Sequence, residues 1–257
     1  MESLRGVAAL MVVFLHIKWS NPLTTLLFFR NGYLMVDLFF VLSGFVICHN
    51  YSQKIGEARD VGHFIFLRFG RLYPLHLFCL IAFLGIEFAK YIGELKLNYA
   101  PYANRAFTIN SVCPFIANLL LIQTFCPFAN LTFNAPSWSI SAEFYTYLVF
   151  AIVILASQKK TVLIFSVFLV LLALCFMLFF GVSGITELPG WSFVRCILGF
   201  FTGVVAYHFY DRYKSNISRW SGSGKAAFSL LAILAAFMFF RENPKLDGFL
   251  VLPVFLP

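Results

Sequence analysis

Long apolar runs separated by short polar connections dominate the sequence, and their length indicates the fold class. Runs of about 17 to 25 residues suit α-helices that cross a bilayer, whereas a transmembrane β-barrel needs short segments of alternating polarity. The run "TVLIFSVFLVLLALCFMLFFGV" is long and continuous. We therefore expect an all-α, polytopic transmembrane helical bundle with about eight membrane segments, at residues 4–19, 32–49, 72–89, 138–157, 161–181, 191–210, 226–240 and 248–257.

The last of these segments is short, although a bilayer requires every backbone polar group to be satisfied inside the protein. The pattern therefore indicates a C-terminally incomplete bundle, or an end segment that packs against the other helices. No internal repeat or low-complexity tract divides the chain, so residues 1–257 are expected to form one domain. The first segment lacks the frame of a cleavable signal peptide and is expected to stay as an anchor.

The run "CPFIANLLLIQTF", residues 113–125, is short for a span, and the positions of the basic residues favour one topology. If this run does not cross and the N-terminus is cytoplasmic, the larger share of Lys and Arg lies in inner connections, as the positive-inside rule requires. If it crosses, the stretches "QKK" and "DRYKSNISRWSGSGK" move outside and the bias reverses. We therefore expect a re-entrant or broken helix here.

Composition agrees with a membrane protein and narrows the set of partners. Hydrophobic residues make up 61% of the 257 residues and charged residues 12%, whereas soluble domains carry about 25% charged residues. The net charge of +8 comes from basic residues in the connections, where they set orientation, so no nucleic-acid partner is expected. The six cysteines lack metal-ligand spacing, and no metal site is expected.

Ionisable residues within membrane segments are candidates for function by default; they are His16, Asp37, Glu143 and Arg195. In "RGVAALMVVFLH", Arg5 and His16 are separated by about three helical turns, so both side chains project from one face, roughly 16 Å apart. Asp37 on the next, antiparallel helix could orient His16 as a general base; alternatively, it satisfies a buried arginine or backbone group. In the same helix, the small residues Ser43 and Gly44 indicate close helix packing rather than chemistry.

Two further polar pairs have the spacing of a binding site. In "LRFGRLYPLH", Arg68 and Arg71 lie at i and i+3, where two guanidinium forks suit a phosphate or pyrophosphate; alternatively, they are topology signals only. In "NAPSWSISAEFY", Ser139 and Glu143 lie four residues apart on one helix face. Glu143 should pair with Arg195, either as substrate support or as a purely structural ion pair.

Four ordered blocks of the chain resemble the bacterial acyltransferase-3 family, integral-membrane enzymes that O-acylate surface polysaccharides and related glycans: "ESLRGVAALMVVFLH", "VDLFFVLSGFVI", "RFGRLYP" and "PSWSISAEFYTY". Glu2 stands where the family usually has Asp. The resemblance implies more helices than this chain holds, acyl-coenzyme A as a cytoplasmic donor, and a glycan acceptor on the other side of the membrane. It also implies essential roles for Arg5, His16, Arg68 and Arg71.

The resemblance and the residues together predict an O-acetyltransferase of the bacterial inner membrane that moves an acyl group from acyl-CoA to a hydroxyl of a cell-surface glycan or glycolipid. Acyl-CoA is a co-substrate, and no permanently bound cofactor is expected. The phosphates of acyl-CoA would dock on Arg68 and Arg71, and its pantetheine arm would follow the helix face that carries Arg5 and His16. His16 would then deprotonate the acceptor hydroxyl. The alternative is a covalent relay in which His16 itself carries the acyl group. The rival functions are a transporter or flippase whose charges line a pathway, and a non-catalytic scaffold.

Overall fold

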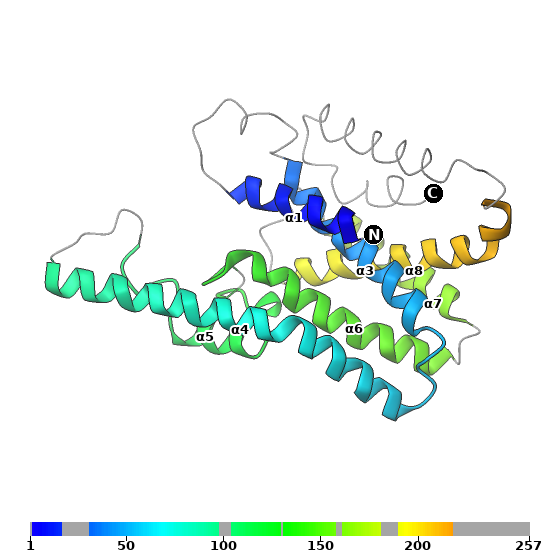
Figure 1. The fold of residues 1–257 in the computed structure, drawn as a ribbon, viewed down its shortest axis with the longest axis horizontal. Helices are drawn as coiled ribbons and strands as arrows, with labels where there is room; N and C mark the ends of the chain where they lie inside the picture. The colour runs from blue at the N-terminus through cyan, green and yellow to red at the C-terminus, as the bar shows by residue number, and fades with distance from the viewer. Residues whose placement is uncertain are drawn as a thin grey trace. The chain divides into compact units, whose positions relative to one another are not determined.

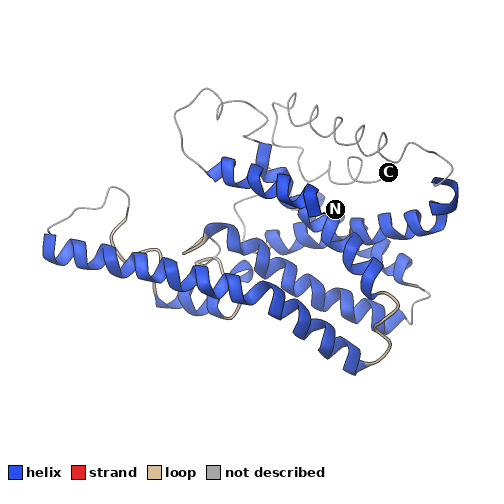
Figure 2. Cartoon of the chain, viewed as in Figure 1, coloured by secondary structure: helices blue, strands red, loops and turns tan. Residues whose placement is uncertain are grey.

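The computed structural model describes residues 2–16, 31–97, 104–129, 131–157, 161–180 and 190–217. Throughout these ranges the regular elements are helices (Figure 1, Figure 2). The α-helices are α1 (Glu2–His16), α3 (Leu34–Tyr51), α4 (Ala58–Leu97), α5 (Val112–Leu119), α6 (Trp138–Ser157), α7 (Val162–Phe179) and α8 (Trp191–Ile217), and the short 3-10 turns are η2 (Asn31–Tyr33), η3 (Gln123–Phe125) and η4 (Ala135–Ser137). The all-α class is confirmed, and five of these helices, α3, α4, α6, α7 and α8, are long and apolar enough to cross a membrane.

One predicted span begins in the wrong place. The segment expected at residues 72–89 is part of α4, which begins at Ala58. Its first turn is capped by Asp60, whose Oδ2 accepts the backbone N–H groups of Gly56 at 2.9 Å and Glu57 at 3.0 Å. Pro74 lies inside the helix without ending it, as membrane helices tolerate. Charged residues in the first turns shifted the apolar window of the sequence analysis toward the C-terminus. The expected spans at 226–240 and 248–257 lie outside the described residues.

The chain divides into two compact units. The first unit comprises residues 1–54, 157–185 and 195–257 and holds α1, α3, α7 and most of α8. The second unit comprises residues 55–156 and 186–194 and holds α4, α5 and nearly all of α6. The single domain expected over residues 1–257 stays a prediction.

In the first unit, α3 and α8 pack with their backbones in direct contact. A Cβ atom added at Gly44 would collide with the carbonyl oxygen of Phe200, and one added at Gly203 would collide with the carbonyl oxygen of Val41. Small residues at a helix interface allow this approach, so the packing role expected for Gly44 is confirmed. The seam defined by Gly44 and Gly203 fixes which residues of the two helices face each other.

The two helices of this seam run in the same direction. Asp37 contacts Arg195 near their N-terminal ends, and the Sγ atom of Cys48 lies 3.9 Å from Nε2 of His208 near their C-terminal ends. Three long apolar helices, α4, α6 and α7, lie between them in the chain; a fourth crossing would make α8 antiparallel to α3. The run at 113–125 forms only the eight-residue α5 and the turn η3. The broken helix expected there is confirmed, and the cytoplasmic N-terminus stays a prediction.

Replacing Gly203 by alanine should destabilise the protein, because neither colliding backbone can move without separating the helices. Overpacking in a core costs roughly 1 to 3 kcal/mol. The matched control is Gly70→Ala in α4, where an added Cβ meets nothing within 4 Å and should be neutral or stabilising. Thermal unfolding of the detergent-solubilised variants checks this. Equal melting temperatures for the two variants would show that the seam is not close-packed.

Candidate active site

A buried ion pair joins α3 and α8 at the start of their seam. The Nε atom of Arg195 donates to Oδ1 of Asp37 at 2.6 Å, and its Nη2 atom donates to Oδ2 at 2.7 Å. The same Nη2 donates to the carbonyl oxygen of Tyr33 at 3.1 Å. Asp37 is 1% exposed and Arg195 6% exposed. This is the two-pronged geometry in which a guanidinium and a carboxylate bind most strongly, and it neutralises two charges in the apolar interior.

This pair corrects two expectations from the sequence. Arg195 was assigned to Glu143, but its ion-pair partner is Asp37. Asp37 was expected to orient His16, but both of its oxygens bond to Arg195, and the described residues contain no hydrogen bond between Asp37 and His16. A guanidinium inside a membrane protein needs a full counter-charge, and the seam places Asp37 opposite it. The alternative interpretation, a carboxylate that satisfies a buried arginine, is the correct one.

Helix α1 carries Arg5 and His16 as a single continuous helix from Glu2 to His16. The backbone therefore has the three-turn spacing expected from the sequence, although the side chain of Arg5 lies outside the described residues. The side chain of His16 is exposed, and its Nδ1 lies 2.8 Å from the carbonyl oxygen of Val12. A carbonyl oxygen only accepts, so Nδ1 carries the proton, and in the neutral ring Nε2 holds the lone pair.

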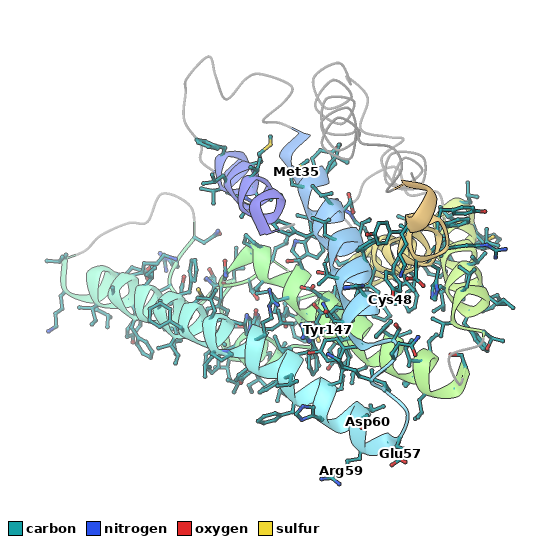
Figure 3. All side chains as sticks on the ribbon, turned by 45° about the vertical axis from the view of Figure 1, so that its right-hand side comes forward. Met35, Cys48, Glu57, Arg59, Asp60 and Tyr147 are labelled. Carbon is teal, nitrogen blue, oxygen red and sulfur yellow. The ribbon has the colours of Figure 1, made fainter. Side chains whose placement is uncertain are left out.

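The packing of α1 on α3 positions this histidine. Figure 1 shows the ribbons of α1 and α3, and the buried cluster that joins these helices consists of Ala8, Met11, Leu34, Met35, Leu38 and Leu42. Met35 of this cluster is labelled in Figure 3. Asp37 lies on the same helix as these α3 residues. Helix α3 therefore both packs against α1, which bears His16, and carries the aspartate of the ion pair.

In the second unit, α4 presents the two arginines in different environments. Arg68 is half-buried, and its guanidinium carbon lies 5.7 Å from the centre of the Phe64 ring, within cation–π range. Arg71, one turn further on, is exposed. Both lie well inside α4, about 15 Å or more from its first residue, rather than at the start of a span. The Phe64 ring thus restrains the guanidinium group of Arg68, whereas the side chain of Arg71 is accessible to a ligand.

Glu143 on α6 has a partner that the sequence analysis missed. The hydroxyl of Tyr147 donates to Oε1 of Glu143 at 2.5 Å, and the Tyr147 ring packs edge-on against Phe64, with 6.1 Å between ring centres. Tyr147 is labelled in Figure 3. Arg68, Phe64, Tyr147 and Glu143 therefore form one cluster between α4 and α6. The spacing of four residues between Glu143 and Tyr147 was the available signal.

Ser139, the other polar residue expected on that helix face, makes a local hydrogen bond. Its Oγ donates to the carbonyl oxygen of Pro136 at 2.9 Å, in the first turn of the helix. This bond satisfies a carbonyl group at the turn that precedes α6.

A comparison with known protein families identifies the family of this chain. A family model described as an acyltransferase domain, acyltransferase-3, matches residues 1–256. The chain belongs to the acyltransferase-3 family. It is therefore an integral membrane enzyme of the transferase class, and the resemblance found in the four sequence blocks is confirmed.

Two relatives of this acyltransferase-3 chain align with a large part of it, and one of them is named an acyltransferase. Protein 2 in picA locus of Rhizobium radiobacter is 32% identical over 183 residues, which cover 67% of this chain and 91% of that protein. Acyltransferase MdmB of Streptomyces mycarofaciens is 33% identical over 160 residues, which cover 58% of this chain and 37% of that protein. The aligned part is thus little more than a third of the second relative. No solved structure matches the chain.

For an acyltransferase, the described geometry provides two different kinds of site. The first unit offers an exposed imidazole with a defined tautomer on α1, which packs on α3, the helix that carries the aspartate of the buried ion pair. The second unit offers an exposed guanidinium one turn from a half-buried one. A lone-pair nitrogen suits proton transfer, whereas paired guanidinium groups suit phosphate.

Proposed function

We propose that this acyltransferase moves an acyl group, acetyl in the first instance, from acyl-CoA on the cytoplasmic side of a bacterial inner membrane to a hydroxyl of a cell-surface glycan or glycolipid. Its membership of the acyltransferase-3 family supports acyl transfer, and the Streptomyces relative is named an acyltransferase. The observation that carries the catalytic part is the hydrogen bond from His16 Nδ1 to the Val12 carbonyl, because it leaves Nε2 as the acceptor nitrogen of a base.

In this proposal the acceptor hydroxyl gives its proton to Nε2 of His16. The hydroxyl oxygen attacks the thioester carbonyl carbon, the carbon–sulfur bond breaks, and an ester forms. The coenzyme A thiolate then takes the proton from the imidazolium ring, so the products are an O-acyl ester and a free thiol, and His16 returns to its neutral form. A base of this kind contributes about 10²- to 10⁴-fold in rate.

The phosphates of the donor dock on Arg68 and Arg71 in this proposal. Arg71 is exposed and Arg68 is supported by the face of Phe64, so one guanidinium is pre-positioned and the other is accessible. Arg5 shares one helix with His16 and belongs to the same acyl-transfer site in this proposal. Asp37 takes no part in proton transfer; with Arg195 it holds α3 and α8 in register beneath α1.

Substituting lysine for either donor-site arginine should weaken acyl-CoA binding while preserving the charge that sets topology. Hydrogen bonds to charged groups are worth roughly 1.5 to 3 kcal/mol, and lysine loses the planar fork. We expect about tenfold weaker binding of acetyl-CoA by Arg68→Lys and Arg71→Lys, measured by calorimetry on the full chain in detergent. The matched control is Arg59→Lys, at an exposed position near the start of α4 (Figure 3).

A second titration with 3′-dephospho-coenzyme A identifies the cause of any loss. Wild-type protein should bind this analogue more weakly than coenzyme A, and the two lysine variants should discriminate less between them. Affinity equal to wild type in both variants would leave the arginines as topology signals and remove the proposed phosphate site.

The proposed reaction itself is tested by incubating the purified full chain with acetyl-CoA and a cell-envelope glycan fraction. We expect free thiol and hydroxylamine-labile acetyl ester to appear in equal amounts. Binding of acetyl-CoA without release of thiol, in the presence of this fraction, would argue for the transporter function instead.

A further inference from the structure

The broken segment between α4 and α6 encloses a network of buried polar side chains in the second unit. Such backbone is tolerated in a membrane protein only where the protein buries it or where it lines a cavity. His76 Nε2 lies 2.9 Å from the carbonyl oxygen of Asn118. Asn118 Oδ1 accepts from Ser137 Oγ at 3.3 Å, and the Ser137 carbonyl accepts from Gln123 Nε2 at 3.1 Å. The network therefore runs continuously from α4 to α5, then to η4, and from η4 to η3.

These side chains bond to backbone carbonyl groups or to one another, but three polar atoms at this segment remain without a partner among the described residues. They are Nδ1 of His76, Oε1 of Gln123 and Oγ1 of Thr124. His76 is 1% exposed, and Gln123 and Thr124 are 0% exposed. Buried polar atoms in native proteins nearly always have a hydrogen-bond partner. Two of these atoms belong to side chains of the network, and the third belongs to Thr124, which follows Gln123 in η3. Together they indicate that the network and its neighbour Thr124 bind a group from outside the chain.

The chemistry of the three atoms defines that group. Because His76 Nε2 donates to a carbonyl oxygen, Nδ1 of the neutral ring is an acceptor, and the amide Oε1 of Gln123 is also an acceptor. The Thr124 hydroxyl can donate or accept. A phosphate or a thioester carbonyl brings further acceptors and does not match, whereas a molecule with several O–H groups supplies the missing donors.

We propose that the buried residues His76, Gln123 and Thr124 form a binding site for a neutral polyhydroxy ligand, whose hydroxyl groups donate to His76 Nδ1 and Gln123 Oε1 and bond to Thr124 Oγ1. The site is closed in this structure, so binding requires the segment that includes α5 and η3 to open. Naming the ligand as the glycan acceptor rests on the proposed function; the binding itself does not.

The test is nitrogen-15 NMR of the full chain labelled at histidine and solubilised in detergent. The chain has five histidines, and His76→Gln assigns the signal of interest, because a glutamine amide can still donate to Asn118. The probe is methyl β-D-glucopyranoside. Its permethylated analogue, with the same ring and no O–H donor, is the control ligand. We expect the glucoside to shift the His76 Nδ1 resonance saturably in the direction of hydrogen bonding, and the analogue to leave it unchanged.

Thr124→Val removes the hydroxyl at nearly constant shape and should raise the dissociation constant for the glucoside about tenfold. Thr202→Val is the matched control, because Thr202 is equally buried and its Oγ1 already donates to the Leu198 carbonyl at 2.7 Å. The proposal would be overturned if the His76 resonance responded equally to both ligands or to neither of them. It would also be overturned if Thr124→Val and Thr202→Val had the same dissociation constant for the glucoside. A His76 signal that is already hydrogen-bonded and does not respond to the glucoside would assign the position to a trapped water. Loss of acyl transfer alone leaves this test unaffected, because binding is read without turnover.

Discussion

Replacing His16 by alanine should lower the rate of acyl transfer by about 10²- to 10⁴-fold, the contribution of a positioned general base. The exposed ring bonds only to the Val12 carbonyl of its own helix in the described structure, so its removal should leave folding and membrane insertion intact. The measurement is the rate at which labelled acetyl from acetyl-CoA enters hydroxylamine-labile ester, with full-length protein at matched amounts.

The control for this substitution is His63→Ala, which removes another exposed histidine, on α4. It should retain wild-type transfer. The loss in His16→Ala should appear in kcat, because a base acts on the transition state rather than on substrate binding. A well-folded His16→Ala protein with near wild-type kcat would remove the assignment of His16 as the base.

Breaking the Asp37–Arg195 pair should have the largest effect on stability. Arg195→Met leaves the carboxylate of Asp37 buried without a counter-charge, and removing one partner of a buried pair costs about 3 to 5 kcal/mol. The double variant Asp37→Leu with Arg195→Met should recover much of this loss, because apolar replacement of a whole buried pair is often neutral. Melting temperature and yield of monodisperse protein in detergent measure both effects.

The matched control is the exposed pair of Lys214 and Asp211 on α8, whose Nζ and Oδ1 atoms are 2.8 Å apart. The side chains are 59% and 50% exposed, and exposed pairs contribute little, so Lys214→Met should barely change the melting temperature. If Arg195→Met behaves like Lys214→Met, the buried pair does not hold the seam. If the double variant has no higher melting temperature than Arg195→Met, Asp37 has a further role that the ion pair does not explain.

Much of the fold follows from hydrophobic pattern and charge alone. The span expected at residues 138–157 coincides with α6, and the distribution of Lys and Arg indicated the break at 113–125 that α5 and η3 form. The start of α4 could not be predicted in this way. Its first turns are charged and depend on the Asp60 cap, so an apolar window excludes them.

The contacts of the candidate site were harder to predict from the sequence than the fold. The partner of each buried polar side chain depends on which helices are neighbours, and the sequence does not show this. With one buried arginine and two candidate carboxylates, the sequence favoured the wrong partner, Glu143, whereas the glycine seam of α3 and α8 places Asp37 against Arg195. Glu143 instead accepts from Tyr147 on its own helix. The network around His76 was missed because its members are spread over four elements, and no local spacing links them.

In the proposed reaction an acyl group is transferred to an acceptor while coenzyme A stays on the donor side of the membrane. This is measured with the full chain in proteoliposomes that enclose a cell-envelope glycan fraction, with acetyl-CoA labelled separately in its acetyl and adenine groups and added outside only. We expect acetyl label to appear inside as hydroxylamine-labile ester, matched by an equal amount of free coenzyme A that keeps the adenine label outside. Entry of both labels together without ester formation would rule out this reaction.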